Sequence, residues 1–271
     1  MGSGIAEICA RRGGDVIVVE ANAEFAEKGL ARIMKSMEGA VSRGKLAAEE
    51  FDKARANLRV VHDWSELSDR EIVIEAISED PEIKVDAFVR LDETLPKDAI
   101  LASNTSSIPI MKLATATKRP SQVIGLHFFN PVPVLPLVEL VPSLMTSTDT
   151  TARVGEFASG MLGKHVIHSK DRAGFIVNAL LIPYLLSAIR MFESGFATAE
   201  DIDAGMVRGC AHPMGPLALT DLIGLDTTMA VAESMYAEFK EPLYAPPPML
   251  SRMCEAGLLG RKTGRGFFVY S

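Results

Sequence analysis

The sequence has few cysteines, no excess of positive charge and no long hydrophobic run, and each shortage excludes a class of protein. Cys9, Cys210 and Cys254 lie far apart, with no Cys-x-x-Cys pair and no histidines at metal-ligand spacing. They are typical of reduced core residues in a cytosolic protein. We therefore expect neither a disulfide framework nor a bound metal.

Charge and hydropathy exclude two further classes of partner. The formal net charge of -7 leaves no basic surface to neutralise a nucleic-acid backbone, and favours small molecules as ligands. The longest apolar run, Ile176 to Ile189, is interrupted by Asn178 and Pro183 and is shorter than the roughly 20 residues that span a bilayer. It predicts a buried helix. The first residues show no cationic and apolar leader, so we expect no secretory signal and a cytoplasmic protein.

The first part of the chain alternates between two kinds of pattern. Apolar runs typical of buried parallel strands occupy residues 15–19, 71–77, 99–102 and 123–126. An amphipathic pattern with helical spacing, residues 25–41, separates the first two runs. Strands that alternate with helices predict an α/β fold with a Rossmann-type parallel sheet, over residues 1–171.

The remaining residues, 172–271, have helical patterns and no strand-like runs. They predict an all-helical C-terminal domain, with helices over residues 174–194, 198–208, 216–239 and 248–256.

The opening Met-Gly-Ser-Gly-Ile-Ala-Glu resembles the middle of a βαβ nucleotide-binding unit. Gly2 would be the last glycine of a Gly-x-Gly-x-x-Gly loop whose first strand is missing. Glu20 follows 18 residues later at a strand end, where an acid binds the adenine ribose and repels a 2′-phosphate. The alternatives are plain flexibility for the glycines and a solvated acid for Glu20. Without the strand, we expect weaker NAD binding and lower stability.

A histidine and an acid flank a proline-rich reversal. His127 follows an apolar strand, prolines force a turn, and Glu139 lies twelve residues later in an otherwise apolar strand that returns over 137–141. A buried acid requires a partner, so the pair predicts a general base oriented by a carboxylate, as hydroxyl oxidation requires. The alternative is a core histidine with satisfied hydrogen bonds.

The polar segment Ser103–Ser107 follows the strand 100–102, at the sheet edge where such folds bind ligands. A cluster that caps a helix N-terminus is the alternative, and the two interpretations are compatible.

Six strings occur in an order that resembles the 3-hydroxyacyl-CoA dehydrogenase family over the entire chain: SNTSS, GLHFFNPVPV, the glutamate twelve beyond the histidine, DRAGFIVN, HPMGP and GRKTGRGFF. The variant HFFNPVPVLPLVELV with SNTSSIPI is most similar to the bacterial 3-hydroxybutyryl-CoA type. The resemblance implies that His127 is the general base, that Glu139 orients it, and that Ser106 and Asn178 hydrogen-bond the substrate oxygen. Taken alone, Asn178 is an ordinary polar residue in a helix.

The resemblance also implies ligand contacts. For NAD they are Gly2, Glu20, Glu79, Lys84, Ser106, Asn130 and Lys262; for coenzyme A they are Ser36, Arg43 and Ser106. Taken alone, Glu79 and Lys84 are typical of a solvated pair, and Lys262 of a surface loop. Relatives commonly carry lysine where Arg43 stands, so Lys45 is an alternative to it. NADP remains open, because an acid at position 20 is only a preference for NAD.

The leading hypothesis is an NAD-dependent oxidoreductase that interconverts (S)-3-hydroxyacyl-CoA and 3-ketoacyl-CoA, with short acyl chains favoured. A dehydrogenase of a free hydroxy acid or sugar acid is the second, and a non-catalytic or cofactor-impaired relative is the third. The apolar helix beyond Ile176 and the resemblance further imply a homodimer formed through the C-terminal domain.

Overall fold

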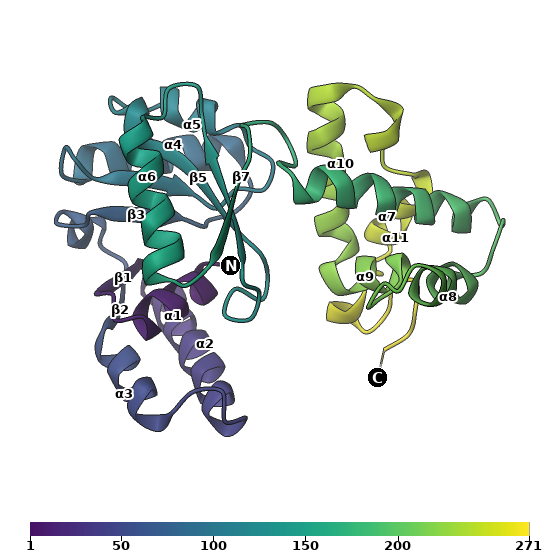
Figure 1. Ribbon diagram of the computed structural model, residues 1–271, viewed down its shortest axis with the longest axis horizontal. Coiled ribbons are helices and arrows are strands. Elements are labelled where there is room, and N and C mark those ends of the chain that lie inside the picture. Colours follow the sequence, from purple (N-terminus) through teal and green to yellow (C-terminus); the bar gives the residue numbers. More distant parts are fainter. Residues whose placement is uncertain (271) are drawn as a thin grey trace. The chain divides into compact units, whose positions relative to one another are not determined.

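The computed structural model describes residues 1–270, which divide into two compact units, residues 1–171 and 172–270. Figure 1 labels most of the helices and strands of both units. The strands are β1 (Val16–Val19), β2 (Leu58–Val61), β3 (Ile72–Glu75), β4 (Ile100–Ser103), β5 (Val123–Phe128), β6 (Leu137–Pro142) and β7 (His165–His168). The helices of the first unit are α1 (Gly2–Arg11), α2 (Ala23–Ser42), α3 (Ala48–Ala56), α4 (Pro81–Thr94), α5 (Ile110–Thr115) and α6 (Thr148–Glu156).

Local chemistry explains where the helices of the first unit begin. The Asn22 side chain accepts the backbone N–H of Phe25 at 2.9 Å and caps α2. Asp80 caps α4 in the same way, ahead of Pro81, whose fixed φ suits the first helical position.

The expected α/β fold with a parallel sheet and a helical second domain is confirmed. Two short strands, β2 and β7, have no strand-like pattern that predicts them from the sequence.

The sheet of the first unit consists of two separate pieces. β1 pairs with β2 in parallel, and a second sheet has the order β3-β4-β5-β6-β7, in which only β5 and β6 are antiparallel neighbours. A doubly wound sheet has the strand order 3-2-1-4-5-6. In this fold, β2 and β1 correspond to the strands numbered 3 and 2 in that order, and β3, β4 and β5 correspond to those numbered 4, 5 and 6. The place of the strand numbered 1, between β1 and β3, holds no strand from residues 1–270.

Burial along the strands agrees with an open place in the sheet. β4 and β5 are buried at every residue, whereas β1 is only partly buried along its length, as are the first three residues of β3.

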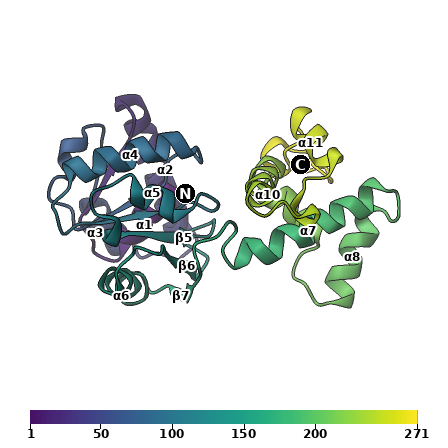
Figure 2. The ribbon, with the colours of Figure 1, turned by 90° about the horizontal axis from the view of Figure 1, so that it is seen from above.

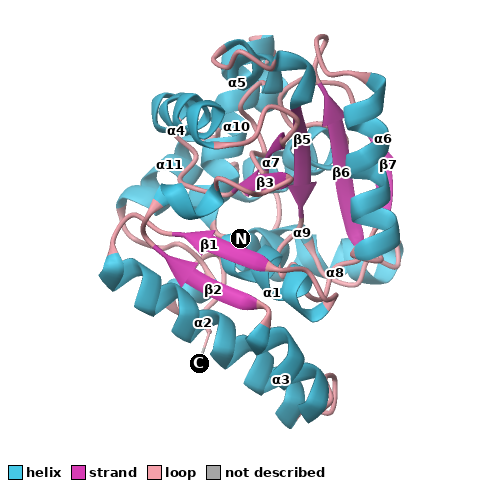
Figure 3. Ribbon diagram, turned by 90° about the vertical axis from the view of Figure 1, so that its left-hand side faces the viewer, coloured by secondary structure: helices cyan, strands magenta, loops and turns pink. Residues whose placement is uncertain are grey.

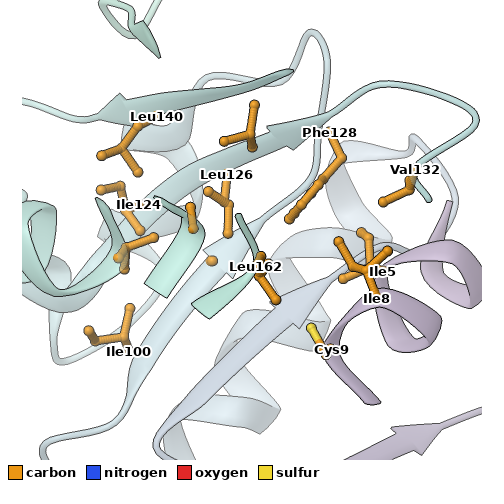
Figure 4. Packing of buried hydrophobic residues seen from close by; sticks show 14 residues of the cluster. Ile5, Ile8, Cys9, Ile100, Ile124, Leu126, Phe128, Val132, Leu140 and Leu162 are labelled. Carbon is orange, nitrogen blue, oxygen red and sulfur yellow. The ribbon is translucent and has the colours of Figure 1, made fainter. Parts of the chain in front are cut away.

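Helices cover both faces of the five-stranded sheet. Figure 2 shows α6 on one side of β5 and β6, with α4 and α5 on the other. Figure 3 shows α2 and α3 beside the β1–β2 pair. In the main core, Ile5, Ile8 and Cys9 of α1 pack with apolar side chains of β4, β5 and β6 (Figure 4). Burial raises the pKa of the Cys9 thiol to about 12.

The second unit is helical and has its own core. It contains α7 (Val177–Glu193), α8 (Ala199–Gly209), α9 (Pro216–Ile223), α10 (Leu225–Phe239) and α11 (Pro248–Glu255). The single helix expected over 216–239 is wrong, because Gly224 has a φ of 103° and ends α9. Cys210 is exposed, so the expectation of a core residue is wrong there.

The C-terminal segment is fixed by one buried acid. Asp221 accepts the backbone N–H groups of Phe267 and Phe268, both at 2.9 Å, and the Tyr270 hydroxyl at 2.8 Å. A Cβ on Gly266 would lie 1.9 Å from Asp221 Oδ1, so only glycine fits there. No helix among residues 1–270 is long and apolar enough to cross a membrane.

Candidate active site

His127 and Glu139 lie directly opposite each other on the antiparallel strands β5 and β6. The Nδ1 atom of His127 is 2.7 Å from Oε2 of Glu139, and the side chains are 8% and 0% exposed. The ring of Phe129 lies 4.7 Å from the imidazole, centroid to centroid. The proline-rich reversal therefore brings the two residues together as the sequence analysis expects.

This geometry gives the pair a defined chemistry. A carboxylate buried in a sheet is costly unless it is hydrogen-bonded, and the tautomer of His127 that carries its proton on Nδ1 would satisfy Oε2 of Glu139. That tautomer leaves Nε2 as the basic nitrogen. The arrangement is able to take a proton from a hydroxyl group and to stabilise the imidazolium that results.

The Ser103–Ser107 segment is joined to the histidine strand. Ser103 ends β4, and the Asn104 side chain accepts the backbone N–H of Phe128, the residue after His127, at 2.9 Å. Ser106 is partly exposed at this edge.

The alternative interpretation of this segment, a helix cap, is wrong for α5. The carboxylate of Asp171 accepts the N–H groups of Ile110 and Met111 at 2.8 and 2.7 Å, and so caps α5 instead.

Glu79 and Lys84 are paired, but they are not a solvated pair. The Lys84 ammonium is 1% exposed and lies 2.6 Å from Glu75 Oε1 and 3.3 Å from Glu79 Oε2. Burial by itself would raise the pKa of Glu79, but the Thr105 hydroxyl and the Lys84 charge outweigh it and lower that pKa. The interpretation as a surface pair is therefore wrong for Lys84.

The beginning of the first unit fits an NAD dinucleotide. A Cβ on Gly2 would lie 3.6 Å from Ala76 Cβ, so the first turn of α1 lies against the end of β3. A Cβ on Gly4 would lie 3.0 Å from Val132 Cβ, which keeps α1 close to the loop after His127. A helix N-terminus at the carboxyl ends of parallel strands is the arrangement that binds pyrophosphate.

Glu20 and Asn130 lie at two other strand ends. Glu20 follows β1, and a Cβ on Gly29 of α2 would lie 3.1 Å from its Oε1. Asn130 is exposed and precedes Pro131 in a cis peptide bond. An acid at the end of β1 suits the hydroxyls of a ribose.

The residues expected to contact coenzyme A lie on α2 or just beyond it. Ser36 is exposed on the helix and Arg43 is its C-cap residue. Lys45, the alternative cation, is exposed two residues later. The helix α2 packs mainly against α1, β2 and α3.

Two of the residues that the sequence predicts for the site belong to the second unit. Asn178 is partly buried in the first turn of α7. Lys262 is 46% exposed and forms an ion pair with Asp226 of α10, so it is more restrained than a free surface lysine. This pairing lowers the pKa of Asp226 against the opposing effect of burial.

Sequence reasoning missed three residues that build the site. Glu75 carried a signal, because it is an acid in the apolar run 72–76, the same feature that identified Glu139. Asn104 lies in the polar segment that the sequence singles out, but its partner, like those of Asp171, is a backbone N–H group of a distant segment, which no local pattern indicates. Among residues 1–270 there is no group of three or more metal-ligating side chains.

Known proteins of one family match this chain over its full length. Residues 1–172 match the NAD binding domain of 3-hydroxyacyl-CoA dehydrogenase, and residues 174–270 match its C-terminal domain. The 3-hydroxybutyryl-CoA dehydrogenase of Mycobacterium tuberculosis is 58% identical over 100% of this chain and 95% of its own length.

Two solved structures share the fold. The crystal structure of M. tuberculosis FadB2 has a TM-score of 0.99 and 58% identity, covering 100% of this chain and 95% of that one. The (S)-3-hydroxybutyryl-CoA dehydrogenase PaaH1 from Ralstonia eutropha has a TM-score of 0.94 and 45% identity, with the same coverage. The chain therefore belongs to the 3-hydroxyacyl-CoA dehydrogenase family of NAD-dependent oxidoreductases.

Proposed function

We propose that this protein interconverts (S)-3-hydroxybutyryl-CoA and acetoacetyl-CoA, with NAD as the hydride carrier. The observation that carries the proposal is the buried His127–Glu139 pair, whose Nδ1 and Oε2 atoms lie 2.7 Å apart. Identities of 58% and 45% to proteins named for this substrate support the acyl-chain length. When bound, the nicotinamide supplies the acceptor or donor of the hydride.

In the oxidative direction, His127 Nε2 takes the proton of the 3-hydroxyl group. Glu139 keeps Nδ1 protonated and stabilises the charge that the ring gains. Ser106 and Asn178 are proposed as donors that hydrogen-bond the substrate oxygen, which stabilises negative charge there during reduction. In that direction, the imidazolium returns its proton to the oxygen.

The proposed cofactor contacts are Gly2, Glu20, Glu79, Ser106, Asn130 and Lys262, and the proposed coenzyme A contacts are Ser36, Arg43 and Ser106. Glu20 favours NAD over NADP, because its carboxylate would repel a 2′-phosphate. Arg43 and Lys45 are cations suited to phosphate groups.

The first test is acetoacetyl-CoA reduction, followed by the loss of NADH or NADPH absorbance. We expect turnover with NADH and a lower kcat/KM with NADPH. A free hydroxy acid such as 3-hydroxybutyrate, offered with NAD, should be a poor substrate in the reverse assay. Turnover of the free acid but not of the coenzyme A ester would favour the second hypothesis of the sequence analysis.

A lengthened chain separates a missing activity from weak cofactor binding. One apolar strand added ahead of Met1 would fill the open place between β1 and β3, and should lower the Kd for NADH. Absence of acetoacetyl-CoA turnover in both forms would contradict the proposed function. Activity in the lengthened form alone would identify this chain as cofactor-impaired.

We also propose a homodimer that forms through the second unit. Leu180 and Met191 lie on one face of α7 and are 74% and 41% exposed, and Phe196 is 79% exposed. Exposed apolar side chains of this size favour a protein partner, and a second copy buries the same face on both chains. Light scattering should give twice the mass of one chain, and Leu180→Asp should lower it; a monomer at all concentrations would contradict the proposal.

A further inference from the structure

A fully buried lysine lies at the centre of a cluster of charged side chains. The cluster adjoins residues 103–107, which we call the Ser106 loop. Lys84 on α4 is among the largest fully buried side chains, and its Nζ contacts Glu75, Glu79 and the carbonyl oxygen of Ile77. A buried charge costs stability unless it is paired, and removing one partner leaves the other uncompensated. The stability of this arrangement therefore depends on all three charged groups.

Glu75 links the cluster to the end of the neighbouring strand. It is the last residue of β3, and its Oε2 accepts the hydroxyl of Ser103, the last residue of β4, at 2.6 Å. The Ser103 oxygen in turn accepts the backbone N–H of Thr105 at 3.2 Å. The other Glu75 oxygen accepts the N–H of Ile77 at 2.7 Å. Glu75 thus forms hydrogen bonds with the segment that follows β3 and with the last residue of β4.

Glu79 links the same cluster to the loop itself. Its Oε1 accepts the backbone N–H of Ser106 at 2.9 Å, the N–H of Ser107 at 3.3 Å and the Ser107 hydroxyl at 3.1 Å. The Thr105 hydroxyl donates to the same oxygen. Oε1 of Glu79 therefore accepts hydrogen bonds from three consecutive residues of the loop, while Oε2 of Glu79 lies 3.3 Å from the Lys84 ammonium.

We infer that Lys84 and Glu75 are positioning residues, which fix the Glu79 carboxylate and, through it, the place of Ser106. The inference rests on the proposed role of Ser106 toward the substrate oxygen. It replaces the direct NAD contact that the family resemblance implies for Lys84, because a side chain that is 1% exposed and already holds three acceptors offers a ligand almost no surface.

The experiment compares two buried cations that pair with acids. Lys84→Met removes the centre of the cluster. Arg119→Met is the matched control. Arg119 Nε lies 2.7 Å from Oδ1 of Asp92, which is near the C-terminal end of α4, and the two side chains are 10% and 7% exposed. The other hydrogen bonds of the Arg119 guanidinium go to the backbone carbonyl groups of residues 92, 95 and 96. Both variants should lose stability. We expect only Lys84→Met to lower kcat, by about 10²-fold, the size of loss that a small misplacement of a catalytic group causes.

Two further readouts distinguish positioning from direct binding. In Lys84→Met the Kd for NADH, from fluorescence titration, should rise together with the fall in kcat, because displacement of Glu79 and Ser106 disturbs proposed cofactor and substrate contacts alike. Amide hydrogen exchange of the segment 103–108 should become faster in Lys84→Met and remain unchanged in Arg119→Met. A large rise in the NADH Kd with kcat retained would overturn the inference in favour of direct contact, and unchanged exchange would overturn it as well.

A milder variant covers the case in which Lys84→Met does not fold. Ser103→Ala removes only the hydroxyl between Glu75 and Thr105, and should also accelerate exchange in 103–108 and lower kcat, by a smaller factor. Hydrogen exchange does not depend on turnover. If neither the wild-type chain nor the lengthened form reduces acetoacetyl-CoA, the proposed function fails, while exchange in the variants still confirms or refutes the positioning.

Discussion

Replacing His127 by alanine should lower kcat for acetoacetyl-CoA reduction by about 10²–10⁴-fold, the usual contribution of a positioned acid or base. The variant removes the only group that the mechanism uses to move a proton to the substrate oxygen. The Kd for NADH should remain within a few-fold of the wild-type value, because the imidazole is not among the proposed cofactor contacts. Steady-state kinetics and an NADH titration measure the two quantities.

His165→Ala is the matched control for this variant. His165 is an exposed histidine on β7, two strands away in the same sheet, and has no role in the proposed mechanism. It should leave kcat unchanged. A His127→Ala enzyme with near wild-type kcat would refute the role of the histidine, whatever the NADH affinity.

Glu139→Gln should also lower kcat by about 10²–10⁴-fold, with little change in the NADH Kd. The amide has the shape of the acid but no charge, so it no longer stabilises the imidazolium. Its NH₂ group is also able to donate to Nδ1, which favours the wrong tautomer of the ring. The loss should therefore appear in kcat and kcat/KM together.

The control for Glu139→Gln is another buried, paired acid. Asp92→Asn removes a charge next to Arg119, and its side chain is 7% exposed against 0% for Glu139. Both variants should lower the melting temperature, and only Glu139→Gln should lower kcat. Equal kinetic effects in the two variants would mean that loss of stability, rather than the tautomer, explains the result.

Local patterns predicted the parts of the site that are close in sequence. An acid in an apolar strand requires a partner, and the prolines after His127 return the chain to it, so the sequence alone predicts the His127–Glu139 pair, whose Nδ1 and Oε2 atoms lie 2.7 Å apart. The same rule applied to Glu75 would have predicted a buried cation nearby. Taken alone, Lys84 is instead typical of a solvated surface residue, whereas it is 1% exposed and pairs with Glu75.

The remaining differences arise from contacts between distant segments. Asp171 caps a helix that begins sixty-one residues earlier, and no local pattern indicates which acid reaches Ile110. Gly224 divides one helical pattern into α9 and α10 because its φ is positive, and a glycine within such a pattern does not by itself reveal its dihedral angle. The short strands β2 and β7 form through pairing with β1 and β6 rather than through strand propensity.

The sequence by itself determined the family, through six strings in a fixed order. It also determined the α/β and helical parts and the pairing of His127 with Glu139, because hydrophobic periodicity and an acid within an apolar strand are visible in short stretches of sequence. Only the tertiary structure decided that Lys84 is buried between Glu75 and Glu79, that one carboxylate oxygen holds the Ser106 loop, and that the sheet is split beside β1. These depend on which backbone and side-chain groups meet after the strands align, and hydrogen bonds between distant segments leave no periodic trace in the chain.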